Sequence, residues 1–300
     1  MRIFPINPYS VIFEIMIYVL FAICVWHASC EGRFVLVELL WTGAYGFALE
    51  WLTLKQLQAY HYGQFLIAMD GAPLAVALGW AVVIYASMRF SDRLPLPDSV
   101  RPILDALLAL NVDLGLDVIA IRIGLWEWNG VALDQQWFGV PYANFWAWFV
   151  VTWAYSGFIR ALRSWQHYRI LRWLYAPFAI VLSLIMVITG SELYRLMASN
   201  GGAGSGNAVA SLFLIVGSLT IVLNALLTAP RTLHDKVLAP IISIVPLVIH
   251  IFAVTVGIIA GIFAKQPILA LICVAMLLIN LGVHGLFWSI GRARLQRLKA

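Results

Sequence analysis

Charged residues and cysteines are both scarce in this chain of 300 residues. Only 11% of the residues are Asp, Glu, Lys or Arg, whereas about a quarter are charged in a soluble domain. The three cysteines, Cys24, Cys30 and Cys273, form no CxxC pair and have no metal-ligand spacing. Their number is odd, so they do not suggest a disulfide framework. These shortages argue against a soluble domain and against a cysteine-based scaffold or metal centre.

Apolar residues, in contrast, make up 63% of the chain and fall into long blocks. A helix needs roughly 20 apolar residues to span the hydrocarbon core, whereas a transmembrane barrel shows ~10-residue alternating segments. The blocks are of the first kind. We therefore predict an all-α, polytopic transmembrane helical bundle in the cytoplasmic membrane. Its nine expected spans lie near residues 11–28, 33–54, 66–88, 102–121, 141–159, 174–197, 208–228, 237–263 and 267–290.

The basic residues predict the orientation of this bundle. Short cytoplasmic loops of membrane proteins carry an excess of Lys and Arg. With nine spans, most of the 19 Lys and Arg residues fall on the side of the C-terminus. The N-terminus is therefore predicted to be outside and the C-terminus cytoplasmic. Because these residues are divided among loops instead of forming one patch, the net charge of +5 does not suggest a nucleic-acid partner.

Residues 1–300 are predicted to form a single integral-membrane domain. The glycine-rich stretch 199–207 is expected to be a flexible loop between the sixth and seventh spans. It divides a part rich in acids and aromatic residues, 1–197, from a part with few polar residues, 208–300. The sequence does not indicate an oligomeric state.

Carboxylates inside apolar segments are the most informative feature of the chain. Asp113 and Asp117 are four residues apart in one predicted helix, so they share a face. On the predicted topology, Glu50 and Asp70 from two neighbouring helices lie in the same outer half of the membrane. Acids within membrane spans are costly and usually mark chemistry or a polar pathway. We therefore expect these four residues to form a functional site.

Four other acids are interpreted as structural. Glu14, Glu38 and Asp105 lie near the ends of predicted helices, where a carboxylate can reach interfacial water or a basic neighbour. Glu192 is placed to pair with Arg195.

Aromatic residues crowd the region of the acid pair, and together they suggest a chemistry. A carboxyl group in low dielectric favours its neutral form, which can protonate a poor base such as an isolated alkene. Aromatic faces attract the resulting carbocation by about 2 kcal/mol or more per ring once desolvated. A second carboxylate can then activate water or remove a proton. Acids, aromatic walls and an apolar chamber thus suit isoprenoid chemistry.

Four motifs occur in a consistent order over about residues 43–150, and together they resemble a known family. This is the integral-membrane carotenoid biosynthesis family that contains the carotenoid 1,2-hydratases, including the bisanhydrobacterioruberin hydratases. The motifs are Gly46-Phe47-Ala48-Leu49-Glu50; Tyr60-His61-Tyr62-Gly63 with Gly71-Ala72-Pro73-Leu74 and Trp80; Asp113 to Asp117 with Gly124-Leu125-Trp126-Glu127-Trp128; and Trp137-Phe138-Gly139-Val140-Pro141 with Asn144-Phe145-Trp146-Ala147-Trp148.

The resemblance implies a hydro-lyase that adds water across the terminal C1–C2 double bond of an acyclic carotenoid, leaving a tertiary alcohol. The expected partners are a carotenoid or other isoprenoid lipid substrate and the membrane lipid. No metal and no other cofactor is implied, in agreement with the lack of a Rossmann fingerprint, a P-loop or a His-rich motif. Val118 follows Asp117 where the family leads us to expect proline. The identity of the carotenoid, and whether one or both ends react, stay open.

These considerations assign expected roles to ten residues. Asp113 and Asp117, with Glu50 or Asp70, are expected to form the acid and water-activating set, with the division between acid and base left open. Expected substrate-binding residues are Trp126, Trp128, Tyr142 and Trp146 around the cation, Asn144 orienting water or a carboxyl group, and Tyr62.

Three other functions stay open from the sequence. A carotenoid cyclase also begins by protonating an alkene, and differs in that an internal alkene traps the cation. An intramembrane prenyltransferase has a similar number of helices, and Asn111, Asp113 and Asp117 loosely echo its aspartate-rich motif, although the later half has no DxxxD. A non-enzymatic lipid or proton-coupled transporter also carries acids in its helices, although the symmetry of inverted repeats is missing here.

Overall fold

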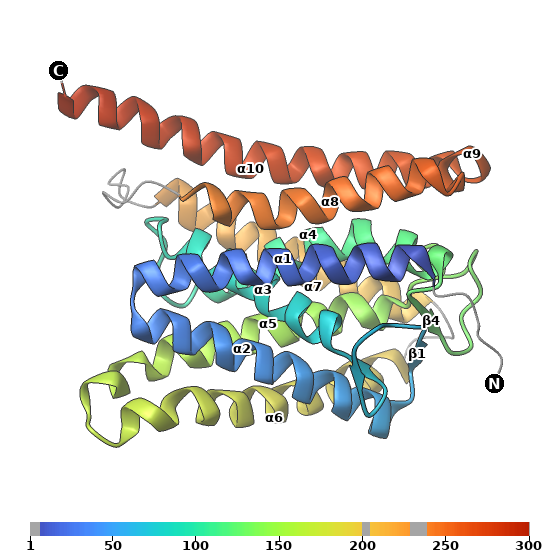
Figure 1. Ribbon diagram of the computed structural model, residues 1–300, viewed down its shortest axis with the longest axis horizontal. Helices are drawn as coiled ribbons and strands as arrows, with labels where there is room; N and C mark the ends of the chain where they lie inside the picture. Colours follow the sequence, from blue (N-terminus) through green and yellow to red (C-terminus); the bar gives the residue numbers. More distant parts are fainter. Residues whose placement is uncertain (1–6, 200–204, 229–238, 300) are drawn as a thin grey trace.

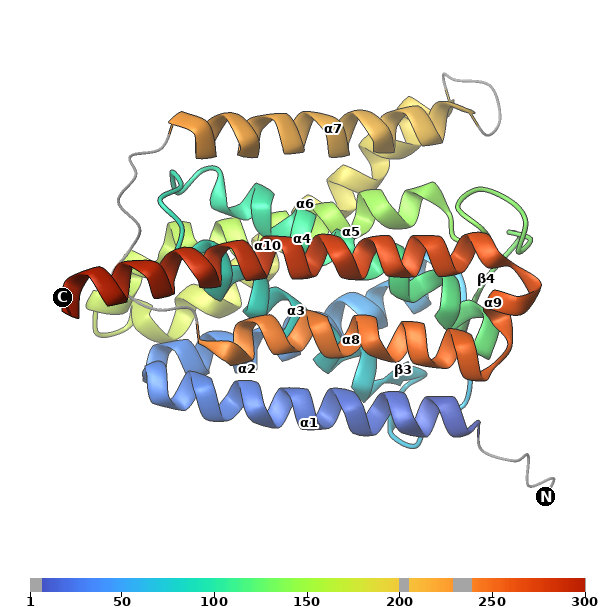
Figure 2. The same cartoon turned by 90° about the horizontal axis from the view of Figure 1, so that it is seen from above.

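The computed structural model describes residues 7–199, 205–228 and 239–299, and this part of the chain is almost entirely helical. Within the described residues, nine long helices lie side by side and alternate in direction along one common axis (Figures 1 and 2). They are α1 (Pro8–Glu31), α2 (Arg33–Leu52), α3 (Leu74–Ser91), α4 (Arg101–Ala120), α5 (Tyr142–Leu162), α6 (Leu171–Ser199), α7 (Ser205–Thr228), α8 (Pro240–Ile259) and α10 (Pro267–Lys299). The predicted all-α, polytopic bundle is confirmed.

Short elements join the long helices. A π-helical turn, η1 (Thr53–Leu57), extends α2, and 3-10 turns follow α4 and α5 as η2 (Ile121–Ile123) and η3 (Arg163–His167). A single helical turn, α9 (Ile262–Lys265), precedes α10. The strands form two small antiparallel pairs, β1 (Tyr60–Tyr62) with β4 (Trp126–Trp128) and β2 (Ala68–Met69) with β3 (Ala72–Pro73).

Seven helices within the described residues are long and apolar enough to cross a membrane, namely α1, α2, α3, α6, α7, α8 and α10. The other two, α4 and α5, have 20 and 21 residues but carry more polar side chains. Three aspartates lie on α4, and α5 holds Asn144 among several Trp and Tyr residues. Because α3, α5, α7, α8 and α10 all contact α4, its polar groups are enclosed by protein. On the predicted nine-span topology, this enclosure makes a span with three acids tolerable.

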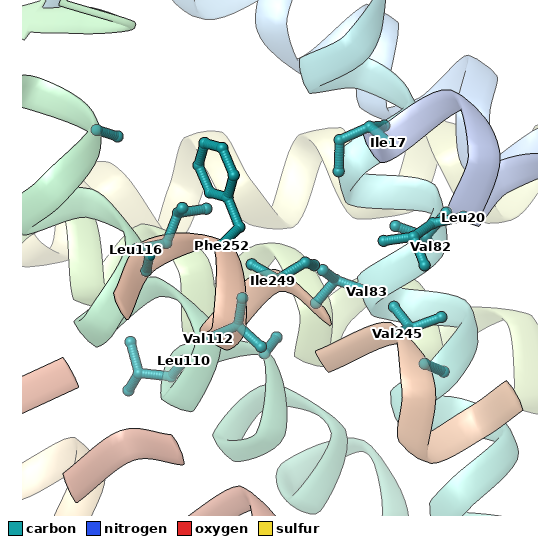
Figure 3. Close-up of a cluster of buried hydrophobic side chains, with 14 of the residues drawn as sticks. Ile17, Leu20, Val82, Val83, Leu110, Val112, Leu116, Val245, Ile249 and Phe252 are labelled. Atoms are coloured by element: carbon teal, nitrogen blue, oxygen red, sulfur yellow. The ribbon is translucent and has the colours of Figure 1, made fainter. Parts of the chain in front are cut away.

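The main packed core joins α1, α3, α4 and α8. Figure 3 shows this cluster, which includes Ile17, Leu20, Val82, Val83, Leu110, Val112, Leu116, Val245, Ile249 and Phe252. In a bilayer such contacts stabilise by close packing rather than by expulsion of water, because lipid tails are as apolar as the side chains. The later helix α8 is therefore an integral part of the bundle around α4.

A glycine allows α2 and α3 to approach closely. A Cβ atom at Gly46 would lie 2.4 Å from the carbonyl oxygen of Ala77 and 2.9 Å from Cβ of Trp80. Small residues at such contacts are typical of helix packing in membranes. Glu50 lies one turn after Gly46, so this approach brings its carboxyl group to the indole of Trp80.

The third span begins later than predicted. Hydropathy placed its start near residue 66, whereas α3 begins at Leu74. The preceding residues form the β2–β3 hairpin, whose turn holds Asp70 and Gly71 at φ angles of +51° and +90°. These left-handed conformations are incompatible with a helix. The sequence had suggested that Asp70 lies in the first turns of a helix. The structure instead places it in the turn of a hairpin.

The two small strands β1 and β4 lie at the end of the bundle where α1 begins and α8 and α9 meet (Figure 1). The helix α10 ends at the opposite side, as an odd number of spans requires. Residues 200–204 of the predicted glycine-rich loop, and the basic residues Arg231 and Lys236, lie outside the described residues. The assignment of this end to the outer face of the membrane stays a prediction.

Candidate functional site

A two-stranded ribbon formed by β1 and β4 covers the end of the bundle. Its register pairs Tyr60 with Trp128, His61 with Glu127, and Tyr62 with Trp126. Because side chains alternate along a strand, two tyrosines and two tryptophans share one face, and His61 and Glu127 share the other. The aromatic face is turned toward the helices, where both tyrosine hydroxyls reach Glu50.

Beneath the aromatic face of the ribbon lies a cavity of about 70 Å³. Side chains from both strands and from four helices surround it, and most of them are aromatic. The lining residues are Glu50, Tyr60, Tyr62, Val76, Trp80, Asp117, Trp126, Trp128, Asn144 and Trp148. We call this space the inner cavity. It has room for a small branched apolar group and water, with carboxyl groups on its wall.

Glu50 is held in the inner cavity by three hydrogen bonds. Tyr60 and Tyr62 donate to its Oε2 atom over 2.6 and 2.5 Å, and Trp80 Nε1 donates to Oε1 over 2.7 Å. Burial, followed by the nearby Glu50, raises the pKa of both tyrosines well above the ordinary value, so the phenols stay protonated donors. Three donors on two oxygens are the pattern that an ionised carboxylate accepts.

Asp113 and Asp117 form a pair joined by Asn144. The Asn144 amide donates to Asp117 Oδ2 over 2.8 Å and to Asp113 Oδ2 and Oδ1 over 3.0 and 3.2 Å. The two carboxyl groups are therefore held by one amide in a buried site. Two negative charges so close to each other in low dielectric repel, which favours a state in which the pair shares one proton. Of the two, only Asp117 lines the inner cavity, and Asp113 lies behind it, fully buried.

Aromatic rings complete the wall around these groups. The rings of Trp80 and Trp148 lie 4.0 Å apart between centroids, and Tyr60 meets Trp128 edge-on at 4.9 Å. Ring faces directed at a confined space stabilise positive charge there, provided that water is excluded. The inner cavity thus combines a proton-holding acid pair, a fixed carboxylate and aromatic surfaces.

Asp70 is not part of this arrangement. Its carboxyl group accepts hydrogen bonds from Lys55 Nζ over 2.9 Å and from Trp51 Nε1 over 2.8 Å, and its side chain is 57% exposed. These hydrogen bonds, that from Lys55 first, lower the pKa of Asp70. The structure therefore places Glu50, and not Asp70, beside the acid pair.

Tyr142 and Trp146 also lie away from the inner cavity. Neither residue lines the inner cavity. Trp146 Nε1 donates to the carbonyl oxygen of Gly190 on α6 over 3.0 Å, and the backbone carbonyl of Tyr142 accepts a hydrogen bond from Ser211 on α7. The reason is helical phase. Successive side chains of an α-helix are rotated by ~100°, so residues two positions before or after Asn144 point about 200° around the axis from it. The structure thus brings together seven of the ten predicted residues and separates Asp70, Tyr142 and Trp146 from them.

Three aromatic residues that line the inner cavity had no predicted role, namely Tyr60, Trp80 and Trp148. For two of them, the spacing in the sequence could have indicated their position in the site. Tyr60 is two residues from Tyr62, the spacing of one face of a strand, and Trp148 is one helical turn from Asn144. Trp80 reaches the site through the contact of α2 with α3, which no local pattern reveals.

Other buried acids lie in ion pairs. At the end of the bundle opposite the ribbon, Arg160 Nη1 is 2.6 Å from Asp105 Oδ2, and Arg163 Nη2 is 3.0 Å from Glu38 Oε2. Glu14 instead accepts hydrogen bonds from the Tyr18 hydroxyl and from the backbone of residues 66 and 67. Within the described residues, no group of three His, Cys, Asp or Glu side chains could hold a metal ion.

Comparison with known proteins gives one match. A family model described as carotenoid biosynthesis protein matches residues 7–210, which include every residue of the inner cavity. Neither the curated proteins nor the solved structures yielded a match.

Proposed function

The chain belongs to the carotenoid biosynthesis protein family, and from this premise we propose that it adds water to the terminal C1–C2 double bond of an acyclic carotenoid. The observation that carries the proposal is the inner cavity, where the Asp113–Asp117 pair and Glu50 meet under aromatic rings. Its size suits the branched end of an isoprenoid chain and not a whole carotenoid.

The first step is transfer of the proton shared by the acid pair. Asp117, which lines the inner cavity, delivers it to C2 of the alkene, and the π electrons form the new C–H bond. A tertiary carbocation then remains at C1. Asp113 stays behind Asp117 and shares the negative charge left on the pair through the Asn144 amide.

Water then captures the cation. Its oxygen forms the C1–O bond and releases one proton to the Asp113–Asp117 pair, which returns to its starting state. The net change is addition of H and OH, and no electron is gained or lost. Glu50 already accepts three hydrogen bonds, so its role is to stabilise the cation by charge, while the pair carries the proton.

Two features favour this reaction over the alternatives. Among the residues that the structure describes, no Lys or Arg lines the inner cavity, although a prenyltransferase needs basic groups for its diphosphate. A cyclase must fold the chain back so that an internal alkene reaches the cation, and the inner cavity of about 70 Å³ leaves little room for such a fold.

Pigment analysis tests the proposal. The chain is expressed in bacteria that accumulate lycopene or another acyclic carotenoid, and extracts are separated by liquid chromatography with mass detection. The expected product is heavier by one or two waters and has an unchanged chromophore. An isomer of equal mass with a shorter chromophore would instead identify a cyclase. Failure to change any of several acyclic carotenoids, with the protein present in the membrane, would overturn the proposal.

A further inference from the structure

The ribbon separates the inner cavity from a second, larger space. On the outer side of β4 lies a pocket of about 400 Å³, which we call the outer pocket. The residues His61, Trp126, Glu127 and Trp128 line it on the ribbon side, and the loop 131–133 lines it on the other. Trp126 and Trp128 line both spaces. These two residues of the ribbon therefore lie between the two spaces.

The outer pocket is polar at its mouth. His61 Nε2 lies 3.4 Å from Glu127 Oε2, and the two side chains are 61% and 77% exposed. On the same ribbon the opposite face carries the phenols that hold Glu50. The ribbon thus presents exposed polar side chains to one space and aromatic side chains to the other.

Trp128 has a hydrogen-bond donor that no described residue satisfies. Its Nε1 atom is buried and has no acceptor within the described part of the chain. Buried indole N–H groups usually find a partner, so an unsatisfied one beside a cavity suggests an oxygen ligand there. Trp80 Nε1, in contrast, already donates to Glu50.

We propose that Trp128 Nε1 and the Asp117 carboxyl group together hold the water that captures the cation, and that this water enters from the outer pocket past Trp126 and Trp128. The inference rests on the proposed function. The water accepts a hydrogen bond from the indole on one lone pair and donates one to Asp117. Its second lone pair is then free to attack C1, and the proton leaves along the bond to Asp117. Trp128 is in this sense a positioning residue.

Protonation of the alkene and capture of the cation by water are separate steps, and each can be measured. If the water is displaced, the cation still forms but loses a proton from C2 and returns to the alkene. In D₂O each such return can leave deuterium at C2 of the recovered carotenoid. The ratio of deuterium exchange to hydration therefore measures water positioning, independently of how much active protein is present.

The variant Trp128→Phe keeps an aromatic ring and removes the N–H group. In D₂O, membranes with this variant are expected to form roughly tenfold less alcohol, the loss typical of one hydrogen bond to a reacting group. Deuterium in the recovered carotenoid is expected to persist or rise. Equal loss of exchange and hydration, or unchanged hydration, would overturn the role of Trp128.

Trp137→Phe is the matched control. Trp137 Nε1 is likewise buried and without an acceptor among the described residues, but its ring packs against Phe138 and Phe145 and does not line the inner cavity. Its exchange-to-hydration ratio should equal that of the unchanged protein. If the unchanged protein shows neither exchange nor hydration, the proposed function itself has failed, which is a different result from a parallel loss in Trp128→Phe.

The route of entry is tested with Ala132→Cys, since Ala132 is exposed and lines the outer pocket. A bulky, membrane-impermeant thiol reagent added from outside should reduce hydration by this variant and leave the unchanged protein, which carries exposed Cys30, active. Full hydration after complete labelling of residue 132 would overturn the outer-pocket route.

Discussion

The amide of Asn144 on α5 lies 2.8 Å from Oδ2 of Asp117 on α4 and holds the cavity-lining member of the acid pair. The same amide also donates to Asp113. An amide supplies two donors and cannot take up the shared proton, so it orders the pair without competing for that proton. This arrangement leads to predictions about chemistry and about folding.

Replacing either acid of the pair by its amide should abolish the proton transfer. We expect Asp117→Asn and Asp113→Asn to reduce hydration at least about 100-fold, the usual contribution of a positioned acid. Asp70→Asn is the control, because Asp70 lies outside the inner cavity and should leave activity unchanged. The measurement is the rate of alcohol formation in membranes, divided by the amount of protein. Full activity of Asp117→Asn would contradict the assignment.

Removing the hydroxyl groups of Tyr60 and Tyr62 one after the other should lower the rate of hydration stepwise. Each tyrosine donates one hydrogen bond to Glu50, and a bond to a charged group contributes about 1.5–3 kcal/mol. Tyr60→Phe should therefore lower the rate, and Tyr60→Phe with Tyr62→Phe should lower it further, toward the level of Glu50→Gln. Initial rates of these three variants and of the unchanged protein check the order. A double tyrosine variant with the unchanged rate would show that the phenols do not support Glu50.

Gly46→Ala should destabilise the bundle. Its Cβ atom would lie 2.4 Å from the carbonyl oxygen of Ala77, so α2 and α3 must move apart, at about 1–3 kcal/mol. Gly43→Ala on the same helix is the control, since its Cβ atom would meet only Leu78 Cδ2 at an ordinary 3.5 Å. Thermal unfolding in detergent should show a lower Tm for Gly46→Ala alone. Equal Tm values would mean that the helix contact adapts freely.

Arg160→Ala should be among the most damaging substitutions, although it lies far from the inner cavity. It would leave Asp105, which is fully buried, without its cation, a loss of about 3–5 kcal/mol for a buried pair. Arg160→Met combined with Asp105→Leu should recover much of that stability, because it removes both charges. Arg195→Ala breaks only an exposed pair with Glu192 and should change the Tm little. Detergent-solubilised yield and Tm distinguish these cases.

The long helices were predictable because the bilayer imposes one length on each apolar block. Each of the nine expected blocks overlaps a long helix, and seven of these helices within the described residues are long and apolar enough to cross a membrane. The main error concerns residues 66–73. Leu66, Ile67 and Met69 are apolar and exposed, so hydropathy counted them with the helix that follows. The Asp70-Gly71 turn that separates them from α3 depends on backbone angles that hydropathy does not report.

The site was predictable in its acids and less so in its aromatic residues. Spacing placed Asp113 and Asp117 on one face, and the structure brings Glu50 to them through the contact of α2 with α3. On α5, however, aromatic residues occur on all sides, so the sequence did not indicate which of them face inward. Only the inward position of Asn144 shows which face of α5 is turned toward the inner cavity. That face includes Trp148 and does not include Trp146.

The small inner cavity has a consequence for selectivity under the proposed function. It accommodates one terminus of a long pigment. The rest of the polyene, including its far end, therefore lies outside the inner cavity and does not contact the residues that line it. The enzyme should accept any carotenoid with one acyclic terminus, including one that carries a ring at the other. Competition between such a monocyclic carotenoid and a fully acyclic one would measure this: comparable conversion per acyclic terminus is expected, and strong rejection of the monocyclic pigment would refute it. A symmetrical pigment would then be processed in two separate encounters, with release between them.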